Sequence, residues 1–391
     1  MKAFSFSRVA AALALAGSCL AAQAQEPIKI GFVGELSGPQ APLGQDQYDA
    51  LMLYVEQQGG KMGGIPVEVI REDSQLKPDI AVQAAQKLIE NNKVSFLTGM
   101  TFAPTAAAVA KVATDNKVFA IGSNGSVNDM AGKGCSPYVF IMSFQPEPVV
   151  AVLGEYADQK GYKRVSMLGP NYVTGKNFLD IFKRSFKGTI ADELYTPMAQ
   201  QDFSAELLQV ASSKPDAVFV FYPGGLGINF VRQYQQSGLG KDVPLLAQGA
   251  LDGTNLPALQ DSALGFITAA SWAPDSDNPQ NKAFVKAFEE KYGRIPTMFA
   301  AYSYDAAQLI DSAITKVKGN LDDKDAVRAA LKAADFPSVR GSFRFNNNHF
   351  PIQDYHILQI AKDDKGRAYR SILTTPFKDR EDPFAKQCPM V

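Results

Sequence analysis

The sequence predicts an α/β protein built from two doubly wound lobes, each with a parallel sheet. Short runs rich in β-branched and aromatic residues alternate with longer helical patterns from Ile28 onward, which is typical of βαβ units. The alternation breaks at 136–148 and then starts again. A chain of 391 residues is also long enough for two domains of ~150 residues each. We therefore expect two lobes in series.

The first lobe alternates regularly between strands and helices. In order, we expect a strand at 28–33, a helix at 46–58, a strand at 66–72, a helix at 79–91, a strand at 94–97, a helix at 104–115 and a strand at 118–121. Parallel strands need helical crossovers of this kind, so the same alternation predicts the parallel sheet.

The second lobe repeats the pattern. We expect helices at 149–160, 175–186, 204–212 and 228–238, with strands at 164–168, 190–195, 217–222 and 244–247. Three further helices at 281–292, 298–317 and 324–334 are followed by strand-like runs at 341–345, 355–361 and 369–374. Three helices without strands cannot form a domain, so we expect them to pack back onto a lobe. The chain would then cross between the lobes more than once.

The N-terminus carries an export signal. Lys2 and Arg8 precede an apolar run at 9–16, and Ala22-Gln23-Ala24 matches the A-x-A cleavage pattern. The run is shorter than the ~20 residues of a membrane-spanning helix. We predict that residues 1–24 form a signal peptide and that the mature chain is periplasmic. Cys19 leaves lipid attachment open as an alternative.

Charge and cysteine content narrow the possible binding partners and predict a disulfide. The net charge of −1 gives no electrostatic footprint for nucleic acid or an anionic membrane. After removal of the signal peptide two cysteines remain, Cys135 and Cys388, and an oxidising compartment favours a disulfide between them. Two separate thiols are the alternative.

The motifs of common enzymes are missing from the sequence. No G-x-S-x-G elbow, P-loop or H-E-x-x-H is present. His349 and His356 have no Cys, Asp or Glu at ligand spacing, so we interpret them as structural and predict no metal and no cofactor. The glycines at 224–227 follow a strand, but the dinucleotide fingerprint fails at Phe230, so we interpret them as a tight turn lining a cleft. Without a base or nucleophile in a credible setting, we predict a binding protein rather than an enzyme.

An ordered set of motifs resembles the leucine/isoleucine/valine-binding family, the branched-chain amino-acid-type solute-binding proteins of ABC transporters. The set covers essentially the whole chain after the signal peptide and consists of KIGFVGELSGP at 29–39, EDSQ at 72–75, AAQKLI at 84–89, FLTG at 96–99, PYVF at 137–140, QDFS at 201–204 and YSYDAA at 302–307. The resemblance implies a type I periplasmic binding protein fold, with two doubly wound lobes joined by three crossovers. It also implies a monomer whose partner is an ABC permease in the inner membrane.

The resemblance also places the lobes and the ligand. We expect crossovers near 142–147, 270–274 and 345–355. The N-terminal lobe would comprise 25–144 plus 274–346, and the C-terminal lobe 145–273 plus 347–391. Ligand would bind between the lobes at the carboxyl ends of the strands, and the lobes would close on it.

The family's pattern implies a set of ligand-binding residues. Loops after the N-terminal strands would offer hydroxyl and backbone N–H groups to a carboxylate, and rings would line the cleft. For single residues of the second loop, a simple cap and turn is an equal alternative. The matching positions are Thr101, Phe102, Ala103, Ser123, Asn124, Gly125 and Ser126 for the loops, and Tyr172, Tyr222 and Phe299 for the rings.

The second lobe departs from the amino-acid binders. Gly249 stands where they carry an acidic residue for the ligand ammonium, and Ala103 where they use a hydroxyl. An ammonium buried without a counter-charge would cost several kcal/mol. We therefore expect a small carboxylic acid, with an aromatic acid such as a benzoate or hydroxycinnamate preferred, and Asn124 and Gln248 reading a ring hydroxyl.

Two further observations bear on the ligand. The C-terminal Cys388-Pro389-Met390 also resembles the family's aromatic-acid binders. A branched-chain amino acid with Asp252 as ammonium partner stays open as an alternative. So does a ligand sensor that docks on a membrane receptor.

Overall fold

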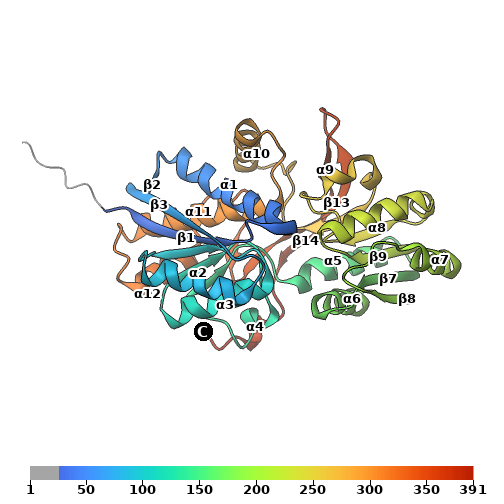
Figure 1. Ribbon diagram of the computed structural model, residues 1–391, viewed down its shortest axis with the longest axis horizontal. Helices are drawn as coiled ribbons and strands as arrows, with labels where there is room; N and C mark the ends of the chain where they lie inside the picture. Colours follow the sequence, from blue (N-terminus) through green and yellow to red (C-terminus); the bar gives the residue numbers. More distant parts are fainter. Residues whose placement is uncertain (1–25, 391) are drawn as a thin grey trace, which may run out of the picture.

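A computed structural model describes residues 26–390 as two α/β lobes, each built around its own sheet (Figure 1). The first sheet has six strands in the order β2-β3-β1-β4-β5-β6. The second has the order β12-β13-β11-β10-β9-β7-β8, with β14 paired to β13. The predicted fold class is confirmed. The predicted signal peptide, with Cys19, lies outside the described residues.

The first lobe follows the predicted alternation. Its elements are β1 (Ile28–Gly34), η1 (Gly38–Gln40), α1 (Ala41–Gln57), β2 (Lys61–Met62), β3 (Ile65–Asp73), α2 (Pro78–Glu90), β4 (Phe96–Gly99), α3 (Ala103–Asp115), β5 (Phe119–Gly122), α4 (Asn128–Ala131) and β6 (Val139–Ile141). From β3 to β6 the neighbouring strands are parallel, and only the short β2 is antiparallel. Helix α1 begins five residues before the predicted start, because Pro42 occupies its first turn, where a missing N–H costs nothing.

The second lobe contains a parallel core and an antiparallel edge. Its elements are α5 (Pro146–Gln159), β7 (Arg164–Pro170), α6 (Val173–Ser185), β8 (Thr189–Thr196), α7 (Ser204–Ser213), β9 (Ala217–Phe221), α8 (Gly224–Gln236), η2 (Leu239–Lys241), β10 (Leu245–Gln248), α9 (Leu256–Leu259), η3 (Gln260–Ala263), β11 (Ile267–Ala270), β12 (Arg344–Phe345), β13 (Pro351–Lys362), β14 (Ala368–Arg380) and η4 (Ala385–Gln387). Strand β11 was not predicted. It lies between β10 and β13 and joins the parallel strands to the long β13–β14 hairpin.

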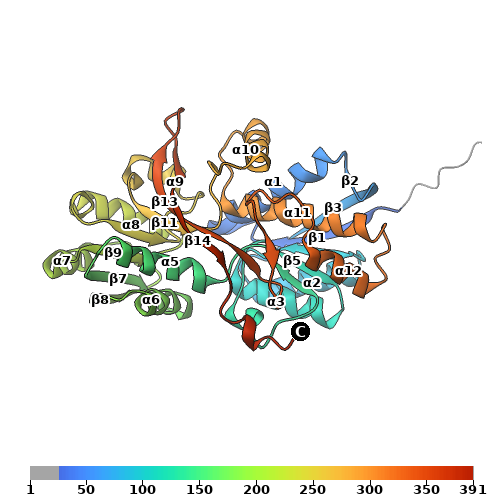
Figure 2. The ribbon, with the colours of Figure 1, turned by 180° about the vertical axis from the view of Figure 1, so that it is seen from behind.

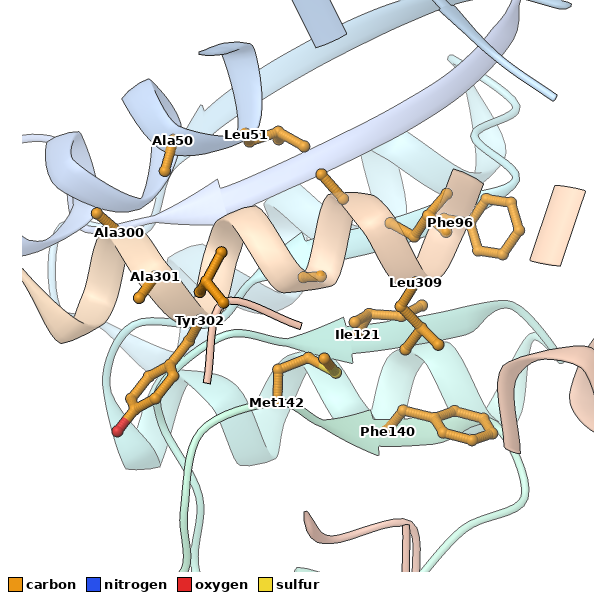
Figure 3. Close-up of a cluster of buried hydrophobic side chains, with 14 of the residues drawn as sticks. Ala50, Leu51, Phe96, Ile121, Phe140, Met142, Ala300, Ala301, Tyr302 and Leu309 are labelled. Atoms are coloured by element: carbon orange, nitrogen blue, oxygen red, sulfur yellow. The ribbon is translucent and has the colours of Figure 1, made fainter. Parts of the chain in front are cut away.

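The three late helices pack onto the first sheet, as predicted. They are α10 (Pro279–Tyr292), α11 (Met298–Lys316) and α12 (Lys324–Ala333). Helix α11 is the central one, and its Leu309 faces Ile121 and Phe140 of the first sheet (Figure 3). The view from behind shows α11 and α12 beside the strands of this lobe (Figure 2). These helices bury their apolar faces against the first sheet, because their own segment of the chain contains no strands.

The chain passes between the lobes three times. It leaves the first sheet after β6, returns after β11 to form α10, and leaves again after α12 to form β13. Arg340 ties two of these passages together, because its Nη1 donates to the carbonyl oxygen of Met142 at 2.5 Å and to Oε1 of Gln353 at 2.8 Å. The exact lobe boundaries stay a prediction.

The C-terminal tail returns to the first lobe. Cys388 is disulfide-bonded to Cys135, with the Cα atoms 5.7 Å apart, as the sequence predicted. Asn348 Nδ2 donates to the carbonyl oxygen of Ala131 at 2.7 Å and to the carboxylate of Asp382. The tail therefore lies against the first lobe, whereas the sequence analysis grouped it with the second. Between residues 26 and 390, no helix has the length and apolar character needed to cross a membrane.

Candidate functional site

A cavity of about 650 Å³ lies between the two lobes, within the range typical of small-molecule sites. We call it the interlobe cavity. Its first-lobe wall comes from η1, the loop after β3 and the start of α3, and its second-lobe wall comes from the ends of β7, β8 and β9 and from α8. Its lining residues are Gln40, Leu76, Phe102, Tyr172, Met198, Gln201, Pro223, Gly225, Leu226, Ile228, Asn229, Arg232 and Ala258.

Three helices begin at this cavity. Phe102, Tyr172 and Pro223 are the N-cap residues of α3, α6 and α8, and all three line the cavity. None of the three supplies a side-chain hydrogen bond to its helix. The first backbone N–H groups of a helix have no partner within it, and the helix dipole is positive at this end. Three such ends around one cavity favour an anion.

The charged groups that line the cavity also favour an anion. No carboxylate is among the lining residues described, and Arg232 is the only cation among them. Arg232 also donates from Nη2 to the carbonyl oxygen of Ala258 at 2.5 Å. Neutral polar groups complete the wall, and Asn229 Nδ2 donates to Oε1 of Gln201 at 2.7 Å. An ammonium group in this cavity would therefore meet no counter-charge.

The two lobes approach each other closely at the edge of the cavity. A Cβ atom added at Gly224 would lie 2.9 Å from Nε2 of Gln40 in the first lobe. Gly224 also has a φ of +58°, which favours glycine. The segment 224–227, predicted as a tight turn, forms the first turn of α8 instead, and its Gly225 and Leu226 line the cavity as expected.

Two of the predicted ligand residues line the interlobe cavity, Phe102 and Tyr172. Ala103 follows Phe102 as the first residue of α3. Burial raises the pKa of Tyr172, so its hydroxyl stays protonated and can act as a donor.

The hydroxyls of the two N-terminal loops turn away from the cavity. Thr101 Oγ1 donates to Oε1 of Gln47 at 2.6 Å, and Nε2 of Gln47 donates to Oγ of Ser123 at 2.7 Å. Asn124 Nδ2 donates to the carbonyl oxygen of Thr101, and Ser126 Oγ to that of Phe144. These side chains brace the loops rather than form the wall.

Gly125 is packed directly behind the start of α3. A Cβ atom added there would lie 2.5 Å from the carbonyl carbon of Phe102 and 2.8 Å from the backbone nitrogen of Ala103. Its N–H donates to the carbonyl oxygen of Met100 at 2.6 Å. Gly125 therefore sets the position of the helix end that lines the cavity.

Apart from Tyr172, the predicted residues of the second lobe and α11 do not line the cavity. Tyr222 is wholly buried, with its hydroxyl 3.2 Å from Oγ1 of Thr196 and its ring packed on Phe230. It directly follows β9, and its ring packs against α8 in the core of the second lobe. Phe299 likewise lies in the first-lobe core.

The remaining predicted residues stabilise the backbone at the end of β10 and in the turn that follows it. Gln248 Nε2 donates to the carbonyl oxygen of Ala269 at 2.9 Å. Gly249 has a φ of +74°, so the turn itself requires glycine here. Asp252 accepts hydrogen bonds from Thr254 and from the backbone N–H of Asn255.

The sequence analysis missed most of the polar lining. Gln40, Gln201, Asn229 and Arg232 were not proposed as ligand residues. Gln201 lies in the loop after β8, at the carboxyl edge of the second sheet, and that position was a usable signal. Gln40 and Arg232 reach the cavity through packing of the lobes, for which the sequence carries no pattern.

Both histidines lie outside the cavity. The ring of His349 stacks on Phe140 with centroids 3.9 Å apart, and burial lowers the pKa of His349 to about 4. His356 Nδ1 is 2.8 Å from Oγ1 of Thr375. Within residues 26–390, no three His, Cys, Asp or Glu side chains are grouped to hold a metal ion.

Comparison with known proteins identifies the family of this chain. Residues 27–366 match the periplasmic binding protein family. The Leu/Ile/Val-binding protein homolog 6 of Brucella melitensis biotype 1 is 30% identical over 95% of this chain and 98% of its own. An ABC-transporter solute-binding protein from R. palustris, solved with benzoate, is 30% identical with a TM-score of 0.85, covering 93% of this chain and 100% of its own. A second solute-binding protein of this kind, from Rhodopseudomonas palustris BisB5 and solved with 3,4-dihydroxybenzoic acid, is 31% identical with a TM-score of 0.84. The match covers 91% of this chain and 99% of its own. The chain belongs to the periplasmic binding protein family.

Proposed function

We propose that this protein is the periplasmic solute-binding receptor of an ABC importer, and that it binds a small aromatic carboxylic acid between its lobes as a monomer. The observation that carries the ligand class is the convergence of three uncapped helix N-termini on a cavity whose described lining holds no carboxylate. That environment stabilises a carboxylate and leaves an ammonium group unpaired. The benzoate and dihydroxybenzoate found in two solved relatives support this class.

Each wall of the cavity has a role in this proposal. The start of α3, at Phe102 and Ala103, supplies backbone N–H groups to the carboxylate. The rings of Phe102 and Tyr172 contact the aromatic body, which gains both apolar burial and ring-ring geometry. In this proposal Gln201 and Asn229, which also line the cavity, bond a ring hydroxyl of the ligand. Closure of the lobes then buries the ligand and presents it to the permease.

The charge argument is tested with 3-phenylpropanoate and L-phenylalanine, which differ only by the ammonium group, and with benzoate and L-leucine as further representatives of the two classes. We expect 3-phenylpropanoate and benzoate to raise the melting temperature of the ligand-free protein, and L-phenylalanine and L-leucine to leave it unchanged. A ligand at 100 times its Kd stabilises the folded state by about 2.7 kcal/mol, so the shift is readily measured. Stabilisation by the amino acids alone would contradict the proposal. It would return the protein to the branched-chain amino-acid binders, with Asp252 as ammonium partner.

Gly125→Ala is expected to weaken binding of the aromatic acid by about tenfold or more, which corresponds to about 1.4 kcal/mol. The added methyl would push against Phe102 and Ala103 and displace the start of α3. Isothermal titration calorimetry measures the loss. The comparison variant is Gly225→Ala, which adds the same methyl to the cavity wall where no atom lies within 4 Å. Equal losses in the two variants would show that α3 does not hold the carboxylate.

A further inference from the structure

A second pocket lies between the lobes, on the side of the passage from β11 to α10. Its volume is about 390 Å³, and it shares no lining residue with the interlobe cavity. Pro42, Asp46 and Thr297 line it from the first lobe, and Leu256, Ala368 and Arg370 from the second. In Figure 1, α9 and α10 stand on opposite sides of this boundary. We call it the arginine pocket.

Arg370 is a buried cation without a carboxylate partner. Its side chain lies on β14 and the residue is 3% exposed. Nη1 contacts Sδ of Met298, from the first lobe, at 3.4 Å. Nη2 is buried and has no hydrogen-bond partner among the described residues. A guanidinium normally enters the interior of a protein only with its donors satisfied.

The other arginines of the pocket are already paired. Arg294 bonds the carboxylates of Asp46 and Asp49, and Arg367 bonds those of Glu289 and Asp363. Arg370, by contrast, has no carboxylate within 4.0 Å in the described part of the chain. The acidic neighbour that acts on it at longer range is Asp252. Its Oδ1 is already bonded to Thr254 and Asn255. Among the described residues, the pocket thus offers one buried cation that has no carboxylate in direct contact.

The rest of the wall is largely apolar. Pro42, Leu256, Pro257, Ile295 and Pro296 surround the space beside Arg370. A strongly hydrated ion such as phosphate would lose its water shell against these side chains. A carboxylate attached to a hydrocarbon body satisfies both parts of the wall, since guanidinium groups bind carboxylates with two parallel hydrogen bonds.

We propose that the arginine pocket is a second ligand site, for a small carboxylate with an apolar body that pairs with Arg370. Both lobes form its walls, and they are in close contact beside it: a Cβ atom at Gly253 would lie 2.7 Å from Cγ2 of Thr297. An occupant therefore favours the lobe arrangement in which these walls meet, and so couples to the interlobe cavity. The site stands independently of the ligand proposed for that cavity.

The test is calorimetric titration of the ligand-free mature protein with benzoate. We expect two binding events in the wild type. The affinity of one should fall at least tenfold in Arg370→Met, and the affinity of the other should fall in Gly125→Ala. Methionine keeps the apolar stem and removes the charge, so the variant is expected to fold. Ala368→Trp fills the pocket without changing Arg370 and should remove the same event. Leu373→Ala alters an exposed residue on the same strand and should change neither event.

The outcomes separate this proposal from the proposed function. A single event that is lost in Gly125→Ala and unchanged in both Arg370→Met and Ala368→Trp overturns the second site and leaves the first. A single event that is lost in Arg370→Met and Ala368→Trp and unchanged in Gly125→Ala supports the arginine pocket. It counts against an aromatic acid in the interlobe cavity. A crystal of the complex with 4-bromobenzoate locates each event, because the bromine marks its ligand.

Discussion

Asp305→Ala is expected to lower the free energy of unfolding by about 3–5 kcal/mol, the usual cost of breaking a buried ion pair from one side. Asp305 on α11 and Arg340 form such a pair, with Nε and Oδ2 2.9 Å apart and side chains 0% and 1% exposed. The carboxylate also accepts hydrogen bonds from the hydroxyl of Ser338 and the backbone N–H of Val339. Its removal leaves a charged guanidinium buried without its counter-charge, although Nη1 keeps its bonds to Met142 and Gln353.

The measurement is urea unfolding followed by circular dichroism. The control is Asp325→Ala, which breaks the pair with Arg328 where the aspartate is 88% exposed, and should cost less than about 1 kcal/mol. Adding Arg340→Met to Asp305→Ala should recover part of the loss, because no charge then stays buried. Losses of equal size at Asp305 and Asp325 would contradict the expectation.

The same pair holds the junction between the lobes. Arg340 donates to the carbonyl oxygen of Met142, and Gln353 Nε2 donates to that of Ser143 at 2.8 Å. These bonds connect the first and third passages to α11. Asp305→Ala therefore changes the support of the hinge as well as the stability of the first lobe.

Cys135→Ser combined with Cys388→Ser is expected to lower the free energy of unfolding by about 4 kcal/mol. The bond joins residues 253 positions apart, and the entropy that a crosslink removes from the unfolded chain grows with the length of the loop. Urea unfolding of the double variant and of the reduced wild type should give the same loss. An unfolding midpoint equal to that of the oxidised wild type would show that the bond contributes nothing.

Loss of this bond should also loosen the tail. The C-terminal residues are otherwise held by side-chain bonds such as those from Asn347 Nδ2 to the carbonyl oxygens of Ala385 and Met390, at 3.1 and 3.2 Å. Limited proteolysis should therefore cleave the double variant near its C-terminus before the wild type. Ligand affinity should change little, because the tail does not line the interlobe cavity.

The sequence by itself determined the fold class, the order of most elements and the disulfide. Strands such as β5 are buried on both faces and read as short continuous apolar runs, so a local pattern locates them. The loop before α3 was expected at the cleft, because a loop at the carboxyl end of a parallel strand lies at the edge of the sheet, and its Phe102 lines the interlobe cavity. Strand β11 was not predicted, although it has the same length of four residues as β5 and is also buried throughout.

Only the tertiary structure decided which polar groups line the interlobe cavity. Gln47 lies 54 residues from Thr101 and 76 from Ser123, yet it binds both hydroxyls and removes them from the wall. Tyr222 directly follows β9 and its ring joins the core. Among the described residues Arg370 has no carboxylate within 4.0 Å, and Asp252 acts on it only at longer range. Periodicity states which face of an element is buried. The partner that satisfies each buried polar group is set by contacts between distant segments, which no local pattern contains.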